Sequence, residues 1–147
     1  MLAQKIAKQI IECFKKGNKL FCIGNGGSAS QATHLVGELQ GKFKLERKPL
    51  PAISLFDLAS MTAIANDYNY KYIFSRPLEA LGNAGDILVV LSTSGKSKNC
   101  LEAIKQANKD GLKVIEWPRR GVGSDKIQEY HLKLIHKVCE LVEKAFI

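Results

Sequence analysis

The stretch that most constrains the fold is residues 19–41, where an apolar run stops at a glycine-rich turn and a helical pattern begins. Residues 20–23 (LFCI) are apolar throughout, which is typical of a strand covered on both faces of a parallel sheet. Residues 24–28 (GNGGS) form the turn. A strand, a glycine turn and a helix N-terminus in this order offer backbone N–H groups and the positive end of a helix dipole, so they predict binding of an anion such as a phosphate ester.

The alternation of strand and helix continues to the end of the chain. Apolar runs predict strands at 19–23, 51–55, 86–91 and 112–115, and helical spacing predicts helices over 1–16, 28–40, 57–66, 71–81, 98–108 and 124–144. Pro77 has to lie in the first turn of its helix or kink it. We therefore expect an α/β fold, a three-layer αβα sandwich with a parallel, flavodoxin-like sheet of four to five strands.

Length and composition indicate one ordinary globular domain, and the charge alone does not decide between small anions and nucleic acid as ligands. The 147 residues suffice for a single core, and no apolar run approaches the roughly 18 residues of a membrane span. The four cysteines have no metal-finger spacing, so we expect reduced core thiols and a cytoplasmic protein. The net charge is +8, but aromatic residues are not interleaved with the basic ones as a nucleic-acid surface requires. We expect neither a membrane nor a specific nucleic acid as partner.

A second candidate anion site is residues 92–97 (STSGKS), directly after the clearest buried strand. Its hydroxyl groups and the free N–H groups of the following helix could hold a phosphate at the same sheet edge as the glycine turn. The Walker A spacing is absent. The alternative is a helix-capping cluster, because serine and threonine are favoured at helix starts without any ligand. The spacing alone leaves both interpretations open.

The candidate acid/base and metal-ligating residues lie on two predicted helices. His34 and Glu38 are four residues apart and share a helix face, which suits two metal ligands, an acid/base pair or a solvated ion pair. Gln128 and His136 share a broad face of the last helix, where a histidine among apolar neighbours is more often a core residue than a catalyst. His131 points away from His136 and is left out of the predicted site.

Six motifs in this order resemble the phosphoheptose isomerases of the sugar-isomerase (SIS) superfamily, from about residue 5 to 145. The resemblance makes residues 1–147 a single SIS domain. The motifs are residues 24–29 (GNGGSA), His34 with Glu38, 62–68 (TAIANDY), 74–76 (FSR), 92–97 (STSGKS), and 127–129 (IQE) with His131 and His136.

The resemblance implies an aldose–ketose isomerase that converts sedoheptulose 7-phosphate into D-glycero-D-manno-heptose 7-phosphate through an enediol, for heptose and lipopolysaccharide-core synthesis. Glu38 and His136 would be the acid/base pair. The implied zinc ligands are His34, Glu38, Gln128 and His136. The implied substrate contacts are Asn25, Gly26, Gly27, Ser28, Glu38, Asn66, Asp67, Ser92, Thr93, Ser94, Ser97 and Gln128, with the hydroxyl groups of residues 92–97 on the phosphate.

The resemblance also implies a homotetramer with active sites near subunit interfaces, so that Glu38 and His136 need not meet within one chain. Two alternatives share the fold: a regulator that associates with a replication initiator, and a sugar-phosphate sensor that binds without turnover. Relatives of the first kind have lost the acid/base residues, whereas this chain has both Glu38 and His136.

The sequence departs from the family pattern in two places. The extra N-terminal helix of the family is expected to be missing, and only residues 116–124 stand where the family places a glycine-rich loop, a helix and a fifth strand. Nine residues cannot hold a helix and a strand, since a crossover needs about a dozen. We expect either a four-stranded sheet with an uncovered edge, or two strands merged through Glu116 and Trp117.

Overall fold

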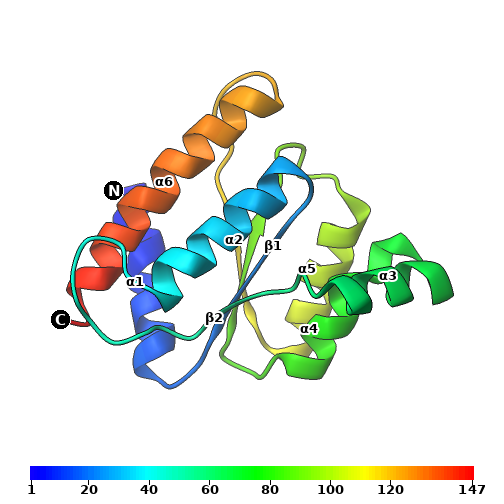
Figure 1. Cartoon of the computed structure of the whole chain (residues 1–147), viewed down its shortest axis with the longest axis horizontal. Helices are drawn as coiled ribbons and strands as arrows, with labels where there is room; N and C mark the ends of the chain where they lie inside the picture. Colours follow the sequence, from blue (N-terminus) through cyan, green and yellow to red (C-terminus); the bar gives the residue numbers. More distant parts are fainter.

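The computed structural model describes all of residues 1–147, with a parallel four-stranded sheet in the order β2-β1-β3-β4 (Figure 1). The strands are β1 (Leu20–Gly24), β2 (Ala52–Ser54), β3 (Ile87–Leu91) and β4 (Lys113–Glu116). The helices are α1 (Leu2–Lys15), α2 (Gly27–Gln40), α3 (Leu58–Asp67), α4 (Ser75–Leu81), α5 (Lys98–Asp110) and α6 (Ser124–Lys144), with a 3₁₀ turn, η1 (Tyr70–Tyr72). The predicted αβα sandwich with a flavodoxin-like strand order is confirmed.

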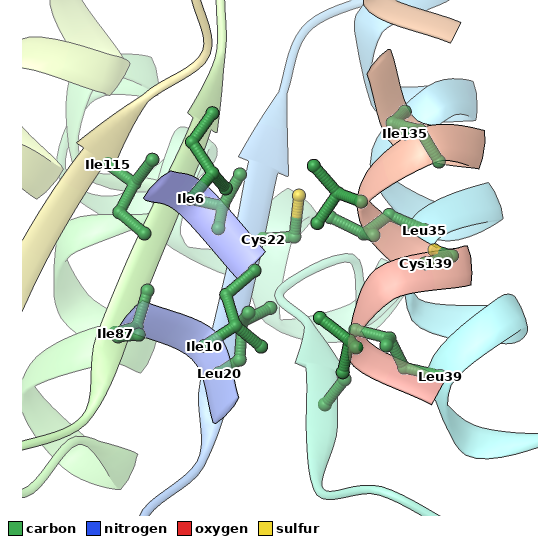
Figure 2. Close-up of a cluster of buried hydrophobic side chains, with 14 of the residues drawn as sticks. Ile6, Ile10, Leu20, Cys22, Leu35, Leu39, Ile87, Ile115, Ile135 and Cys139 are labelled. Atoms are coloured by element: carbon green, nitrogen blue, oxygen red, sulfur yellow. The ribbon is translucent and has the colours of Figure 1, made fainter. Parts of the chain in front are cut away.

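Two apolar cores lie on opposite faces of the sheet. Helices α1, α2 and α6 cover one face, and α4 and α5 lie on the other side of the strands (Figure 1). Figure 2 shows how the first core is filled by side chains from the strands and these three helices: Ile6, Ile10, Leu20, Cys22, Leu35, Leu39, Ile87, Ile115, Ile135 and Cys139. Helix α3 has no buried residue and projects from the body of the molecule (Figure 1).

The helix starts follow local chemistry that the sequence displays. The Asp57 carboxylate accepts a hydrogen bond from the Ser60 N–H at 2.9 Å and caps α3, as predicted. The predicted helix over 71–81 is instead divided into η1 and α4. Pro77 lies in the first turn of α4, where the missing N–H group has no intrahelical partner to lose. The first-turn alternative for this proline is therefore confirmed.

The sheet ends at β4 without a fifth strand. Trp117 donates one further backbone hydrogen bond to Val90 at 2.9 Å, and its fully buried indole donates to the His131 carbonyl at 3.3 Å. The chain then leaves the sheet at Pro118. The expectation of four strands is confirmed, and the alternative of two strands merged through Glu116 and Trp117 is wrong.

All four cysteines are buried and free, as the sequence analysis predicted. Burial raises the pKa of the Cys13 and Cys100 thiols to about 11, and that of Cys139 to about 12. These thiols therefore stay protonated and unreactive at neutral pH. No helix has the length and apolar character that crossing a bilayer requires.

Asp86 joins the starts of β1 and β3 at the edge of the sheet opposite the glycine turn. Its carboxylate is 1% exposed and accepts from the Lys19 N–H and the Asn18 amide at 3.0 Å, and from the Asn83 N–H and the Lys19 ammonium at 2.7 Å. Burial would raise the pKa of Asp86, but the hydrogen bonds from Lys19, Asn83 and Asn18 outweigh it and lower the pKa below 3.8.

Replacing Asp86 with Asn should lower the free energy of unfolding at pH 7 by about 3 kcal/mol, because one charged hydrogen-bond hub is lost. A lowered folded-state pKa contributes stability above the unfolded value of 3.8, and this contribution disappears as the pH falls through the folded value. Urea unfolding from pH 7 to pH 2 should therefore show a flatter acid limb for Asp86→Asn. The exposed control Asp125→Asn should change the free energy of unfolding by under about 1 kcal/mol. Equal changes for the two variants would show that the Asp86 carboxylate makes no special contribution to stability.

Candidate active site

The two candidate anion-binding turns lie side by side at the carboxyl edge of the sheet. Gly24, the last residue of β1, pairs with Leu91, the last residue of β3. Neighbours β2 and β3 flank β1, so this edge is the switch point where ligands of such sheets bind. A Cβ on Gly24 would lie 2.8 Å from the Ser28 backbone and 2.9 Å from the Leu91 carbonyl, so only glycine allows the turn to pass this close. The predicted convergence of the turns is confirmed.

Asn25 is held in place by a reciprocal pair of amide hydrogen bonds. Its Nδ2 donates to Asn99 Oδ1 at 2.9 Å, and Asn99 Nδ2 donates back to Asn25 Oδ1 at 2.8 Å. The Tyr70 hydroxyl lies 3.4 Å from the same Asn25 oxygen. These groups and their neighbours line a cavity of about 530 Å³ between η1 and the start of α5. No sequence motif pointed to Asn99, which is 3% exposed and 74 residues from Asn25.

The serines of residues 92–97 shape the loop but do not cap the helix. Ser92 Oγ accepts from the Gly95 N–H and Ser94 Oγ from the Lys96 N–H, both at 3.0 Å. Ser97 is the N-cap of α5, yet its side chain makes no capping hydrogen bond. Its hydroxyl and the first N–H groups of α5 therefore remain for a ligand, which favours anion binding over the capping interpretation.

His34, Glu38 and His136 come together between α2 and α6. The two histidine Nε2 atoms are 3.3 Å apart, and His34 Nε2 is 3.8 Å from Glu38 Oε2. One ligand atom from each residue lies within 4.8 Å of the others. The resemblance implied that Glu38 and His136 need not meet within one chain, but here they do, because α2 and α6 run side by side (Figure 1).

This cluster fits a zinc ion. Two nitrogens bound at about 2.0–2.1 Å to a tetrahedral metal lie about 3.3–3.4 Å apart. That is the observed separation of the two imidazole nitrogens, 3.3 Å, and the carboxylate oxygen lies 3.8 Å from one of them. Two imidazoles and one carboxylate are also a donor set found at catalytic zinc sites, which keep a position for water or substrate.

Gln128 lies at the other end of this helix pair, beside the glycine turn. A Cβ on Gly27 would be 2.7 Å from the Gln128 Nε2 and 2.8 Å from its Oε1. The Gln128 carbonyl accepts from the Gln31 amide at 2.7 Å. Eight residues of helix, about 12 Å along the axis, separate Gln128 from His136. This position suits a substrate contact, and metal ligation by Gln128 stays a prediction.

The remaining sequence candidates lie in two different environments. Asn66 and Asp67 end α3 in exposed positions, and the Asn66 amide donates to Asp67 Oδ1 at 3.1 Å without a hydrogen bond to the other candidates. The structure therefore does not bring this pair to the cluster of His34, Glu38 and His136. His131 is fully buried, and burial lowers the pKa of its imidazole, as suits a core residue outside the site.

Comparison with known proteins identifies the family. Residues 3–116 match the SIS domain model. The curated phosphoheptose isomerase of Campylobacter concisus is 45% identical, and the alignment covers 95% of this chain and 82% of the relative. The chain belongs to the phosphoheptose isomerase family. Solved phosphoheptose isomerases from Francisella tularensis (34% identity, TM-score 0.92) and Neisseria gonorrhoeae (33%, 0.89) each align with 97% of this chain and 85% of their own.

In this member of the phosphoheptose isomerase family, a buried arginine that sequence reasoning missed holds the end of α2. The Arg47 guanidinium donates to the carbonyls of Glu38 at 2.6 Å, Leu39 at 3.0 Å and Gly41 at 2.5 Å. These are carbonyls that the helix end leaves without intrahelical partners. Arg47 Nε lies 3.4 Å from Glu143 Oε1, and both side chains are 1% exposed. The backbone of Glu38 is thereby fixed directly.

Glu143 fixes the opposite side of the same cluster. Its two oxygens accept from the Phe43 and Lys44 N–H groups, both at 2.9 Å. The Phe43 ring in turn stacks on His136, with ring centroids 5.5 Å apart and planes 19° apart. Burial would raise the pKa of Glu143, but the backbone N–H donors and the Arg47 charge outweigh it and lower the pKa. The buried pair thus orients both Glu38 and His136.

Glu143→Ala should lower the free energy of unfolding by about 3–5 kcal/mol, because it leaves the Arg47 charge buried without its partner. Chemical denaturation followed by circular dichroism measures this loss. The matched control is Glu140→Ala on the same helix, whose exposed pairs with Lys137 and Lys144 should contribute under about 1 kcal/mol. A Glu143 effect no larger than that of Glu140 would show that the pair does not hold the helices.

Proposed function

We propose that this protein is an isomerase that converts sedoheptulose 7-phosphate into D-glycero-D-manno-heptose 7-phosphate. The observation that carries this proposal is the close approach within one chain of Glu38, on the helix that begins at the glycine turn, and His136, on α6. The 45% identity to a phosphoheptose isomerase over 95% of the chain supports the substrate. A regulator or sensor without turnover would have no need of a preserved acid/base pair.

The reaction moves a proton between C1 and C2 of the sugar through an enediol. Glu38 removes the proton from C1 of the ketose and returns it to C2. His136 donates a proton to the oxygen on C2 and accepts one from the oxygen on C1, so the imidazole ends as it began. A carboxylate and an imidazole can exchange protons in this way near neutral pH.

The rest of the proposed site binds and orients the sugar phosphate. The hydroxyl groups of residues 92–97 and the N-terminus of α5 hold the phosphate, because both offer hydrogen-bond donors to an anion. Asn25, fixed by Asn99, and the glycine turn contact the sugar chain. The full proposed set of contacts is Asn25, Gly26, Gly27, Ser28, Glu38, Asn66, Asp67, Ser92, Thr93, Ser94, Ser97 and Gln128.

The proposed cofactor is zinc, held by His34, Glu38 and His136; Gln128, whose amide lies against Gly27 in this structure, would have to turn toward the ion to act as a weaker further ligand. The 3.3 Å separation of the two imidazole nitrogens supports this choice. A bound zinc ion would polarise the substrate carbonyl and stabilise negative charge on the enediolate oxygens. Glu38 has two carboxylate oxygens, so ligation through one leaves the other for proton transfer.

We propose a cytoplasmic homotetramer as the active form. Helix α3 buries none of its residues within the chain and leaves Leu58 76% exposed, as suits a helix covered by another subunit. The exposed pair Asn66 and Asp67 at the end of α3 would reach a substrate in such an assembly. The four free thiols support a reducing compartment.

Glu38→Gln should abolish isomerisation of sedoheptulose 7-phosphate, a loss of at least about 10²-fold in kcat, because an amide cannot act as the base. The loop of residues 92–97 is unchanged, so inorganic phosphate should bind to the variant as it does to the parent. Turnover assays with added zinc and calorimetric titration with phosphate measure the two properties. Full activity of Glu38→Gln would remove Glu38 from the reaction.

Removing the metal should abolish turnover, and adding zinc should restore it. After dialysis against a chelator and reloading, the parent should retain about one zinc per chain, measured by mass spectrometry of the metal content. His34→Ala should lose most of this zinc. Mutating even a hydrogen-bond partner of a metal ligand lowers metal affinity by about 10-fold or more, and removing a ligand should cost at least as much. Equal zinc content in the parent and His34→Ala would contradict the proposed ligand set.

A further inference from the structure

We infer that Arg119 is an additional phosphate-binding residue of this site, an inference that rests on the proposed function. Arg119 lies in the link between β4 and α6, and its guanidinium faces the loop of residues 92–97. A Cβ on Gly95 would lie 2.8 Å from each of Arg119 Cζ, Nη1 and Nη2. Equal distances to three atoms of one plane place the flat face of the guanidinium over Gly95.

The Arg119 charge has no partner within the chain. The side chain is exposed and makes neither a hydrogen bond nor an ion pair, whereas Arg47 is bound by Glu143 and four carbonyls. Its neighbour Arg120 lies over the Tyr130 ring, 5.5 Å from the centroid. Arg119 therefore offers a free fork of five N–H donors, the geometry that matches a phosphate with two parallel hydrogen bonds.

The link holds Arg119 near the loop from both sides. Two residues earlier, Trp117 is fully buried and bonded to Val90 in the sheet. Five residues later, the Ser124 hydroxyl lies 3.5 Å from that of Thr93 in the loop. The guanidinium is thus tethered beside a loop whose Ser97 hydroxyl is unused. The Arg119 guanidinium therefore lies against Gly95, two residues before Ser97 and the first N–H groups of α5.

This arrangement belongs to the part of the chain that the family match leaves unassigned. The SIS domain model ends at Glu116, before the link begins. The alignment with the Campylobacter concisus relative extends over 156 positions, more than the 147 residues of this chain, so the relative carries residues that this chain lacks. Arg119 is accordingly assigned from the geometry of this chain alone.

The test compares Arg119→Ala with the adjacent control Arg120→Ala. For Arg119→Ala, the KM for sedoheptulose 7-phosphate and the inhibition constant of inorganic phosphate should both rise about 10-fold or more, while kcat stays within about twofold. Arg119→Lys should recover part of the loss, because lysine keeps the charge without the fork. Arg120→Ala should match the parent in every constant. Calorimetric titration with inorganic phosphate provides the same comparison without turnover.

Each outcome separates the inference from the proposed function. Parental KM and phosphate affinity in Arg119→Ala, with turnover intact, would overturn the inference and leave the isomerase in place. A parent protein that binds phosphate but does not isomerise the sugar would overturn the function, and the calorimetric comparison would still decide the role of Arg119. No phosphate binding by the parent would overturn the inference. Equal thermal unfolding of the parent and Arg119→Ala would establish that the variant is folded.

Discussion

The buried pair of Arg47 and Glu143 is the interaction on which the geometry of the proposed catalytic residues depends. A buried ion pair costs a large desolvation free energy, which its own attraction often fails to offset. Here four carbonyls accept from the guanidinium and two N–H groups bind the carboxylate, so both charges are solvated by the backbone. The pair joins the end of α2, residues 43–47 that follow it and the C-terminal part of α6. The pair thus fixes the helices that carry Glu38 and His136 at one end of their contact, and the hydrogen bond from Gln31 to the Gln128 carbonyl joins them at the other end.

Helix α2 connects the two halves of the proposed site. It begins at Gly27 in the glycine turn, beside the loop of residues 92–97, and carries His34 seven residues after Gly27. Seven residues of helix extend about 10 Å, on the scale of an extended sugar phosphate. The anion end depends on backbone N–H groups at a sheet edge, whereas the acid/base end depends on side chains from two helices. One rigid element therefore sets the distance between phosphate recognition and proton transfer.

Features encoded by neighbouring residues could be predicted from the sequence. The strands, the glycine turn, the Asp57 cap and the first-turn position of Pro77 follow from local periodicity and backbone chemistry. The contributions of Arg47, Glu143 and Asn99 could not be predicted, because each depends on a partner 74 to 100 residues away along the chain. Helix spacing alone could not predict the meeting of His34 with His136, because it cannot tell which helix packs against another; only the family resemblance implied that these two residues share a metal site.

The short link before α6 shows how a fifth strand can be dispensed with. Trp117 adds a single hydrogen bond to the sheet and buries its whole side chain in the core beneath α6. One large apolar anchor thus fixes the start of the link, and the contact between Thr93 and Ser124 fixes its end. Because the link is so short, the residues between Trp117 and Ser124 pass next to the loop of residues 92–97. The same short link that takes the place of a fifth strand therefore brings the Arg119 guanidinium onto Gly95.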